Sequence, residues 1–135
     1  MLFRSHHGFS IRLPERWIHV EGEHGVFAAN GPIWDHDVSL EIFLWPYPTV
    51  DAFLERFGRS LFAGTWRRSS GPVEIAGRPG IAVSVEDPSG EIALDFFFLE
   101  LGDGRVMVIL ASYPEEVAAQ WRPWFQASLD TLEIR

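Results

Sequence analysis

The residues best suited to metal chemistry gather around one short acidic segment. Asp35, His36 and Asp37 are consecutive, and His19 and His24 stand in neighbouring segments. Such nitrogen and oxygen ligands hold divalent metals when three or four converge on one point. Adjacent side chains on an extended chain point in opposite directions, however, and no two histidines have the spacing of a helical metal-binding pair. We therefore interpret these residues as loop and surface side chains, and predict no metal and no other cofactor.

Nucleophilic catalysis has little support in the motifs of the chain. No serine lies in a G-x-S-x-G sequence, which would hold a nucleophile on a sharp strand-to-helix turn. Cysteine is absent, which excludes thiolate catalysis, disulfides and zinc–sulfur sites. Asp95 is the one carboxylate that stands among apolar residues, and a buried carboxylate needs a partner for its charge. We expect that partner to be Arg105, across a hairpin; the alternative is that Asp95 is a catalytic acid. We predict no catalytic residue.

Aromatic residues are the stronger functional lead. The 135 residues include six tryptophans and eleven phenylalanines, more than a core of this size easily hides. Trp34 lies in a polar loop that contains glycine and proline, and Trp45 and Tyr47 belong to a segment, Trp45-Pro46-Tyr47-Pro48, that is typical of a rigid extended connector. Aromatic side chains anchor protein interfaces. We predict that Trp34, Trp45 and Tyr47 border a partner-binding or dimer surface; the alternative is that they close the ends of the fold.

Charge and hydropathy narrow the class of protein. The net charge is −8, and the basic residues are scattered, with Arg67-Arg68 as their only adjacent pair. Nucleic-acid binding needs clustered positive charge, so it is not expected. The N-terminal residues lack the apolar stretch of a signal peptide, and no apolar run is long enough to span a bilayer. We expect a soluble cytoplasmic protein; the alternative is that a leader has been removed.

The length of 135 residues predicts one domain over residues 1–135. Alternation predicts strands over residues 2–5, 9–13, 17–20, 26–29, 38–45, 66–69, 72–75, 78–86, 91–101 and 105–112. Helical spacing predicts a first helix that Thr49 caps and Gly64 ends, in which Gly58 allows close approach to a sheet. A second helix follows Pro114 and extends to Leu132, and Pro123 is expected to kink or divide it.

The strand over residues 91–101 decides the predicted architecture. Both of its alternating sets of side chains are largely apolar, which is typical of a strand covered on both faces. The two helices are the elements available to cover it. The fold class is therefore α+β: an antiparallel β-sheet with a helix on each face, in a three-layer α/β/α sandwich.

The order of these elements is similar to that of a known fold. An N-terminal strand of the form F-x-I-x-x-P-x-x-W is followed by a helix, a long meander and a C-terminal helix with an aromatic residue and a Ser-Leu pair. The matching residues are Phe9, Ile11, Pro14, Trp17, Phe125, Ser128 and Leu129. The chain thereby resembles, over its whole length, the PsbP/Mog-like superfamily. That superfamily includes the photosystem II extrinsic protein PsbP, the Mog-type Ran-binding proteins, and bacterial DcrB-like and Rhs-effector adaptor proteins.

The resemblance implies a non-enzymatic protein that binds another protein. Members of the superfamily act as adaptors, assembly factors or chaperones, and several are dimers. We therefore predict a bacterial, cytoplasmic adaptor or chaperone-like module with a protein partner, with a homodimer as one form of it. The alternative is a small-molecule-binding or enzymatic domain that uses a cleft between the sheet and the C-terminal helix. Asp95, His36 or arginines would line such a cleft.

Overall fold

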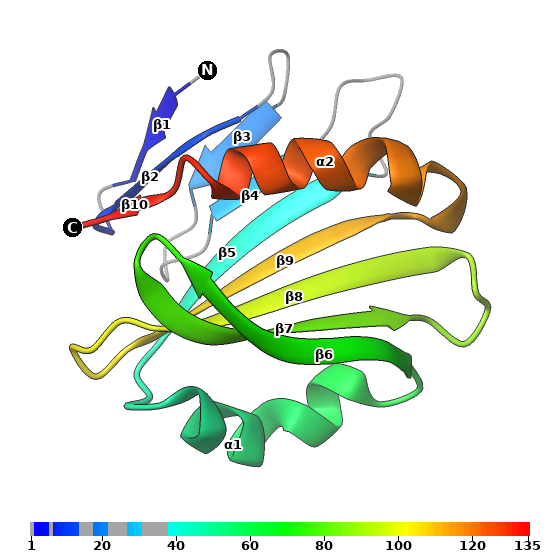
Figure 1. Ribbon diagram of the computed structural model, residues 1–135, viewed down its shortest axis with the longest axis horizontal. Coiled ribbons are helices and arrows are strands. Elements are labelled where there is room, and N and C mark those ends of the chain that lie inside the picture. Colours follow the sequence, from blue (N-terminus) through cyan, green and yellow to red (C-terminus); the bar gives the residue numbers. More distant parts are fainter. Residues whose placement is uncertain (1, 6, 14–17, 22–26, 31–37) are drawn as a thin grey trace.

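A computed structural model describes residues 2–5, 7–13, 18–21, 27–30 and 38–135 of the chain (Figure 1). Its elements, in chain order, are β1 (Leu2–Arg4), β2 (Phe9–Arg12), β3 (Ile18–Glu21), β4 (Phe27–Asn30), β5 (Ser39–Trp45), α1 (Val50–Phe62), β6 (Trp66–Ile75), β7 (Arg78–Glu86), β8 (Ile92–Glu100), β9 (Val106–Pro114), α2 (Ala118–Leu129) and β10 (Glu133–Ile134). A single 3-10 turn over Glu115–Val117 joins β9 to α2. In this part of the chain, neither helix has the length and apolar composition that crossing a bilayer requires.

Seven strands form a large antiparallel sheet in the order β3-β4-β5-β9-β8-β7-β6. The hairpins β6–β7, β7–β8 and β8–β9 follow one another along the chain, and the β5–β9 pairing joins them to the N-terminal strands. Within β8, side chains on both faces are buried, among them Phe98 and Leu99. The prediction that this strand is covered on both sides is confirmed.

The two helices lie on opposite faces of the large sheet (Figure 1). Val50 and Phe53 of α1 pack against one face, in a core that includes Val83 and Phe98. On the other face lie α2 and a small antiparallel sheet in the order β1-β2-β10. The predicted α+β sandwich, with a helix on each face of an antiparallel sheet, is confirmed.

The small sheet includes a strand that the sequence did not predict. The helical pattern extends to Leu132, but α2 ends at Leu129, and Glu133–Ile134 then pair with Ser10 and Phe9 of β2. The hydroxyl of Thr131 donates to the carbonyl of Ser128 (2.6 Å) and accepts from the backbone N–H of Arg12 (2.8 Å). Leu132 keeps its place in the core because the turn, rather than another helical residue, directs it inward.

Three further expectations are wrong in detail. The residues predicted as two strands, 66–69 and 72–75, form one strand, β6, with a register irregularity between Arg67 and Ser69. The helix α2 continues through Pro123, so the predicted division is wrong, and the predicted kink stays a prediction. Gly58 does not provide close approach to the sheet, because a Cβ placed on it would meet only the Cβ of Leu54, at 3.9 Å.

The start of α1 is held by two side chains. Thr49 is the predicted N-cap, and its Oγ1 accepts from the backbone N–H of Ala52 (3.0 Å). Glu100, at the end of β8, accepts from the backbone N–H of Val50 (3.0 Å). A carboxylate at this position also suits the partial positive charge of the helix N-terminus. These contacts fix the first turn of α1 against the end of β8.

Candidate functional site

The predicted interface residues Trp45 and Tyr47 lie against α1, on the same two phenylalanines. The ring of Trp45 is centred 6.1 Å from that of Phe53 and 5.4 Å from that of Phe57. The ring of Tyr47 meets both phenylalanines edge-on, with each pair of centroids 5.6 Å apart. Contacts of this geometry stabilise aromatic pairs beyond the burial of their area. The alternative interpretation, in which these residues help to close the fold, therefore holds in part.

Local geometry brings these four rings together. Phe53 and Phe57 are four residues apart on α1, so they share one face of the helix. The backbone N–H of Tyr47 donates to the carbonyl of Trp45 (2.9 Å), which closes a three-residue turn around Pro46. The predicted extended connector is thus wrong at this point. Because the chain turns, Tyr47 is brought back to the helix that Trp45 already contacts.

An open groove of about 260 Å³ lies beside this cluster, between α1 and the sheet. Its lining residues are Phe43, Trp45, Phe53, Phe57, Ser60, Leu61, Phe96, Val108 and Leu110. We call it the aromatic groove. Every lining side chain except that of Ser60 is apolar, and Trp45 remains 38% exposed. An apolar groove with an exposed tryptophan has the composition of a site that receives a side chain from another molecule.

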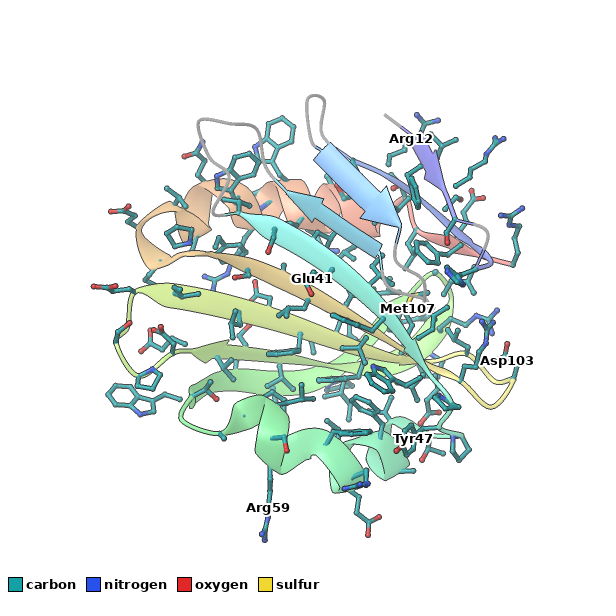
Figure 2. All side chains as sticks on the ribbon, turned by 180° about the vertical axis from the view of Figure 1, so that it is seen from behind. Arg12, Glu41, Tyr47, Arg59, Asp103 and Met107 are labelled. Carbon is teal, nitrogen blue, oxygen red and sulfur yellow. The ribbon has the colours of Figure 1, made fainter. Side chains whose placement is uncertain are left out.

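One carboxylate lies close to this groove. Glu41, Phe43 and Trp45 alternate along β5 and so project from the same face of the sheet. Figure 2 shows Glu41 on the central part of this strand and Tyr47 beside the start of α1. Among the residues that the structure describes, no arginine forms an ion pair with Glu41. Glu41, two residues along the strand from Phe43, thus has no cationic partner within the described part of the chain.

A polar cluster lies on the opposite face of the sheet, beneath α2. Asp95 is 8% exposed, and its carboxylate accepts from the hydroxyl of Ser84 (2.7 Å), the hydroxyl of Tyr113 and the Nε of Arg122 (3.2 Å). The same Nε lies 3.0 Å from the oxygen of Tyr113. These four residues are the Asp95 cluster. Three donors, one of them a cation, satisfy the buried carboxylate, which is what its desolvation requires.

The predicted pair of Asp95 with Arg105 is wrong. In the β8–β9 register, Asp95 lies opposite Ala111 in the middle of the hairpin, whereas Arg105 precedes the first paired residue of β9 and belongs to the turn. Arg105 instead forms an ion pair with Asp103 in that turn (2.7 Å). Its hydrogen bond, together with the charge of the guanidinium, lowers the pKa of Asp103. Arg122 reaches Asp95 because α2 packs against β9, the strand next to β8, on the face to which Asp95 points.

Several candidate residues lie outside the described part of the chain. They are Pro14, Trp17, His24, Trp34, Asp35, His36 and Asp37. Among the residues that the structure does describe, no three histidine, aspartate or glutamate side chains gather as a metal ion would require. The structure therefore brings Trp45 and Tyr47 together on α1 and does not describe Trp34, and the interface role of all three residues stays a prediction.

The residues that complete the aromatic groove and the Asp95 cluster carry little signal in the sequence. The apolar spacing of Phe53, Phe57 and Leu61 was visible, but it indicated only a helix face packed on a sheet. Arg122 carried no signal, because nothing local to it indicates which strand lies beneath α2. Tyr113 likewise follows a strand pattern that does not identify its hydrogen-bond partner.

Comparison of the sequence with known protein families and with curated proteins finds no match. Comparison of the structure does find similar proteins. Cyanobacterial PsbP (CyanoP) from Synechocystis sp. PCC 6803 superposes with a TM-score of 0.74 and 12% identity, over 100% of this chain and 92% of that one. A point mutant of protein Mog1 gives a TM-score of 0.68 and 11% identity, over 99% of this chain and 95% of that one.

A third similar structure is LpqN, which is involved in cell envelope biogenesis of Mycobacterium tuberculosis. Its TM-score is 0.61 with 11% identity, over 93% of this chain and 82% of LpqN. At such low identities the likeness shows the fold alone. The chain has a PsbP/Mog-like fold, as predicted, and proteins with this fold have varied roles.

Proposed function

We propose that this chain is a non-enzymatic adaptor or chaperone-like module, and that the aromatic groove receives a bulky apolar side chain of a partner protein. The observation that carries the proposal is the exposure of Trp45 at the edge of a groove lined almost entirely by apolar side chains. Aromatic anchors of this kind contribute most of the binding energy in many protein interfaces. The proposed surface is bordered by Trp45 and Tyr47, and by Trp34 as the sequence predicts.

The charges near the groove indicate the chemistry of the partner. Glu41 lies on the same face of β5 as the groove residue Phe43, about 7 Å away at two residues along a strand. The chain as a whole carries a net charge of −8. We therefore expect a partner segment with a bulky apolar residue for the groove and a lysine or arginine for Glu41. Opposite charges of this kind favour the correct partner and speed association.

The polar chemistry of the chain supports a non-enzymatic role. The carboxylate of Asp95 accepts from three side chains of its own fold, and these hydrogen bonds account for its burial. We therefore assign Asp95 a structural role and not that of a catalytic acid. The proposal also retains one domain over residues 1–135 and the predicted cytoplasmic location, which fractionation of the native cell tests.

The test compares two tryptophans that are both exposed but lie on opposite sides of the sheet. The tagged chain is used to isolate a partner from its native cell, and the purified pair is then measured by isothermal titration calorimetry. Trp45→Ala and Glu41→Lys are expected to weaken binding about tenfold or more, since truncated anchors commonly cost that much. Trp124→Ala removes a tryptophan that is 54% exposed on α2, and should leave the affinity within about twofold.

Equal affinities for the wild type and all three variants would refute the proposal. Circular dichroism and thermal unfolding show whether Trp45→Ala is still folded, and Glu41→Lys tests the surface without removing an aromatic contact. Analytical ultracentrifugation addresses the homodimer. If the isolated chain self-associates and Trp45→Ala abolishes this association, the occupant of the groove is a second copy and the proposal of a separate partner is wrong.

A further inference from the structure

The groove beneath α2 presents a guanidinium that is held at one edge and free at the other. Arg122 uses its Nε to contact Asp95 (3.2 Å) and Tyr113 (3.0 Å), and its guanidinium carbon lies 5.5 Å from the centre of the Tyr113 ring. Within the described residues, neither terminal Nη atom of Arg122 has a hydrogen-bond partner in the protein. The side chain is 40% exposed, so these donors reach the surface.

The surroundings of Arg122 form a pocket of a size suited to a small molecule. The groove has a volume of about 440 Å³, and its lining residues are Ser84, Asp95, Phe97, Ala119, Arg122, Pro123, Phe125, Gln126 and Leu129. Small-molecule sites are typically of this order of size and largely apolar, with a few polar groups that fix orientation. Two of the polar groups are already engaged, because Ser84 donates to Asp95 and Gln126 donates to Asp130 (3.0 Å). Arg122 is thus the cation of this lining, and both of its terminal Nη groups have donors to spare.

We propose that this groove binds small carboxylates with an apolar body, and that the terminal Nη atoms of Arg122 hold the carboxylate. The guanidinium fork matches the two oxygens of a carboxylate, and such charge-assisted hydrogen bonds are about twice as strong as neutral ones. The contacts of Nε with Asp95 and Tyr113 hold the side chain in place before the ligand arrives. This reduces the conformational entropy that binding would otherwise cost.

Charge favours a carboxylate over a phosphate in this groove. The buried carboxylate of Asp95 already lies against the Nε edge of Arg122, so the pair has little net charge. The whole chain is acidic, with a net charge of −8. A phosphate dianion would meet this negative field with only one cation, Arg122, whose charge Asp95 already shares. The single negative charge of a carboxylate can be matched by the two free Nη groups of Arg122. The aromatic and aliphatic lining, including Phe97 and Leu129, then packs against the apolar part of the ligand.

The experiment titrates the full chain, labelled with ¹⁵N, with phenylacetate and with its neutral analogue phenylacetamide. We expect phenylacetate to bind with a Kd of about 1 mM and the amide about tenfold more weakly, because a charge-assisted hydrogen bond is lost. The Nε–H signal of Arg122 and the amide signals of Phe97 and Ala119 should shift during the phenylacetate titration. Acetate tests the need for an apolar body, and inorganic phosphate tests the need for a carboxylate. Both should bind more weakly than phenylacetate.

Variants assign the effect to one arginine. Arg122→Lys keeps a positive charge near Asp95 but removes the fork, and should weaken phenylacetate binding about tenfold. Arg105→Lys is the matched control, because Arg105 forms an arginine–aspartate pair with Asp103 far from the groove, and it should leave binding unchanged. If Arg122→Lys does not fold, the comparison of acid with amide on the wild-type chain decides the question.

Equal binding of phenylacetate and phenylacetamide would overturn the proposal, as would signal shifts that leave Arg122, Phe97 and Ala119 unmoved. Phosphate binding as tight as that of phenylacetate would overturn the assignment to carboxylates, and acetate binding as tight would overturn the need for an apolar body. Equal weakening by Arg122→Lys and Arg105→Lys would show that the chain responds to its overall charge and not to a site. The result does not depend on the aromatic groove, which lies on the opposite face of the sheet.

Discussion

The Nε of Arg122 lies 3.2 Å from Oδ2 of Asp95, so a residue of α2 compensates a carboxylate that β8 directs into the layer between sheet and helix. The hydroxyl of Tyr113, on β9, donates to the same carboxylate oxygen. One oxygen thus ties together two neighbouring strands and the helix above them. The contacts orient α2 on the sheet, in addition to the apolar packing of Trp121, Phe125 and Leu129.

The Asp95 cluster is expected to act as a coupled unit. Asp95→Ala should lower the free energy of unfolding by about 2–4 kcal/mol, because it leaves the hydroxyls of Ser84 and Tyr113 without their acceptor and Arg122 without its counter-charge. Tyr113→Phe should cost about 1–2 kcal/mol, and the double variant should cost at least about 1 kcal/mol less than the sum. Urea unfolding measures all three values. Additive effects would contradict the coupling, and Tyr113→Phe combined with the distant Asp103→Ala should be additive.

Gly80 has no room for a side chain, because Phe98 and Leu99 on the neighbouring strand β8 lie too close to it. A Cβ at this position would lie 2.1 Å from the carbonyl oxygen of Phe98 and 2.8 Å from a methyl carbon of Leu99. Gly80→Ala should therefore destabilise the chain by about 2–4 kcal/mol, since backbone must move to relieve the overlap. Gly71→Ala, on the adjacent strand β6, is the control, because its Cβ would meet nothing within 4 Å. Thermal unfolding that shows similar losses for both variants would contradict this explanation.

Gly58 is expected to lower the stability of α1 without having a packing role. Its Cβ would meet only Leu54, so Gly58→Ala should raise the free energy of unfolding by about 0.5–1 kcal/mol through the higher helix propensity of alanine. Gly64, which follows the helix with a φ of 73°, is the contrasting position, and Gly64→Ala should destabilise. Chemical denaturation measures both. A loss of stability in Gly58→Ala would indicate that the glycine has a packing role after all.

We expect Asp87 to make the stability of the chain depend on pH in the acid range. The hydroxyl of Ser89 donates to its carboxylate (2.8 Å), and this hydrogen bond, with those from backbone N–H groups of the turn, lowers the pKa of Asp87 below its ordinary value of 3.8. A carboxyl group with a lowered pKa in the folded state stabilises the fold above its unfolded pKa. That contribution is lost as the pH falls through the folded pKa.

We therefore expect Asp87→Asn to lower the Tm at about pH 7, with the difference from wild type disappearing toward about pH 2. Differential scanning calorimetry across this range measures the difference. Ser89→Ala removes the main hydrogen-bond donor to Asp87, so the Tm of this variant should depend less on pH than that of the wild type. A Tm difference between Asp87→Asn and wild type that stays constant across the range would show that the ionised carboxylate is not the cause.

Much of the fold could be predicted because its signals are local. Phe9 and Ile11 alternate with polar residues and are fully buried in the structure, and Thr49 caps the helix whose spacing follows it. The C-terminal strand β10 could not be predicted in the same way. A segment of two residues is too short to show the alternation of a strand. Glu133 and Ile134 form a strand only because they pair with the edge of β2.

The candidate sites show the same difference between local signals and long-range contacts. Residue type and alternation are properties of neighbouring positions, so the amino-acid sequence shows that Trp45 and Tyr47 stand beside prolines and that Asp95 lies on an apolar strand. The folded chain is needed to show that both aromatic residues meet on α1 and that Arg122, rather than Arg105, compensates Asp95. Hydrogen bonds and ion pairs act over a few ångströms, and strand register and helix crossing decide which distant residues come that close.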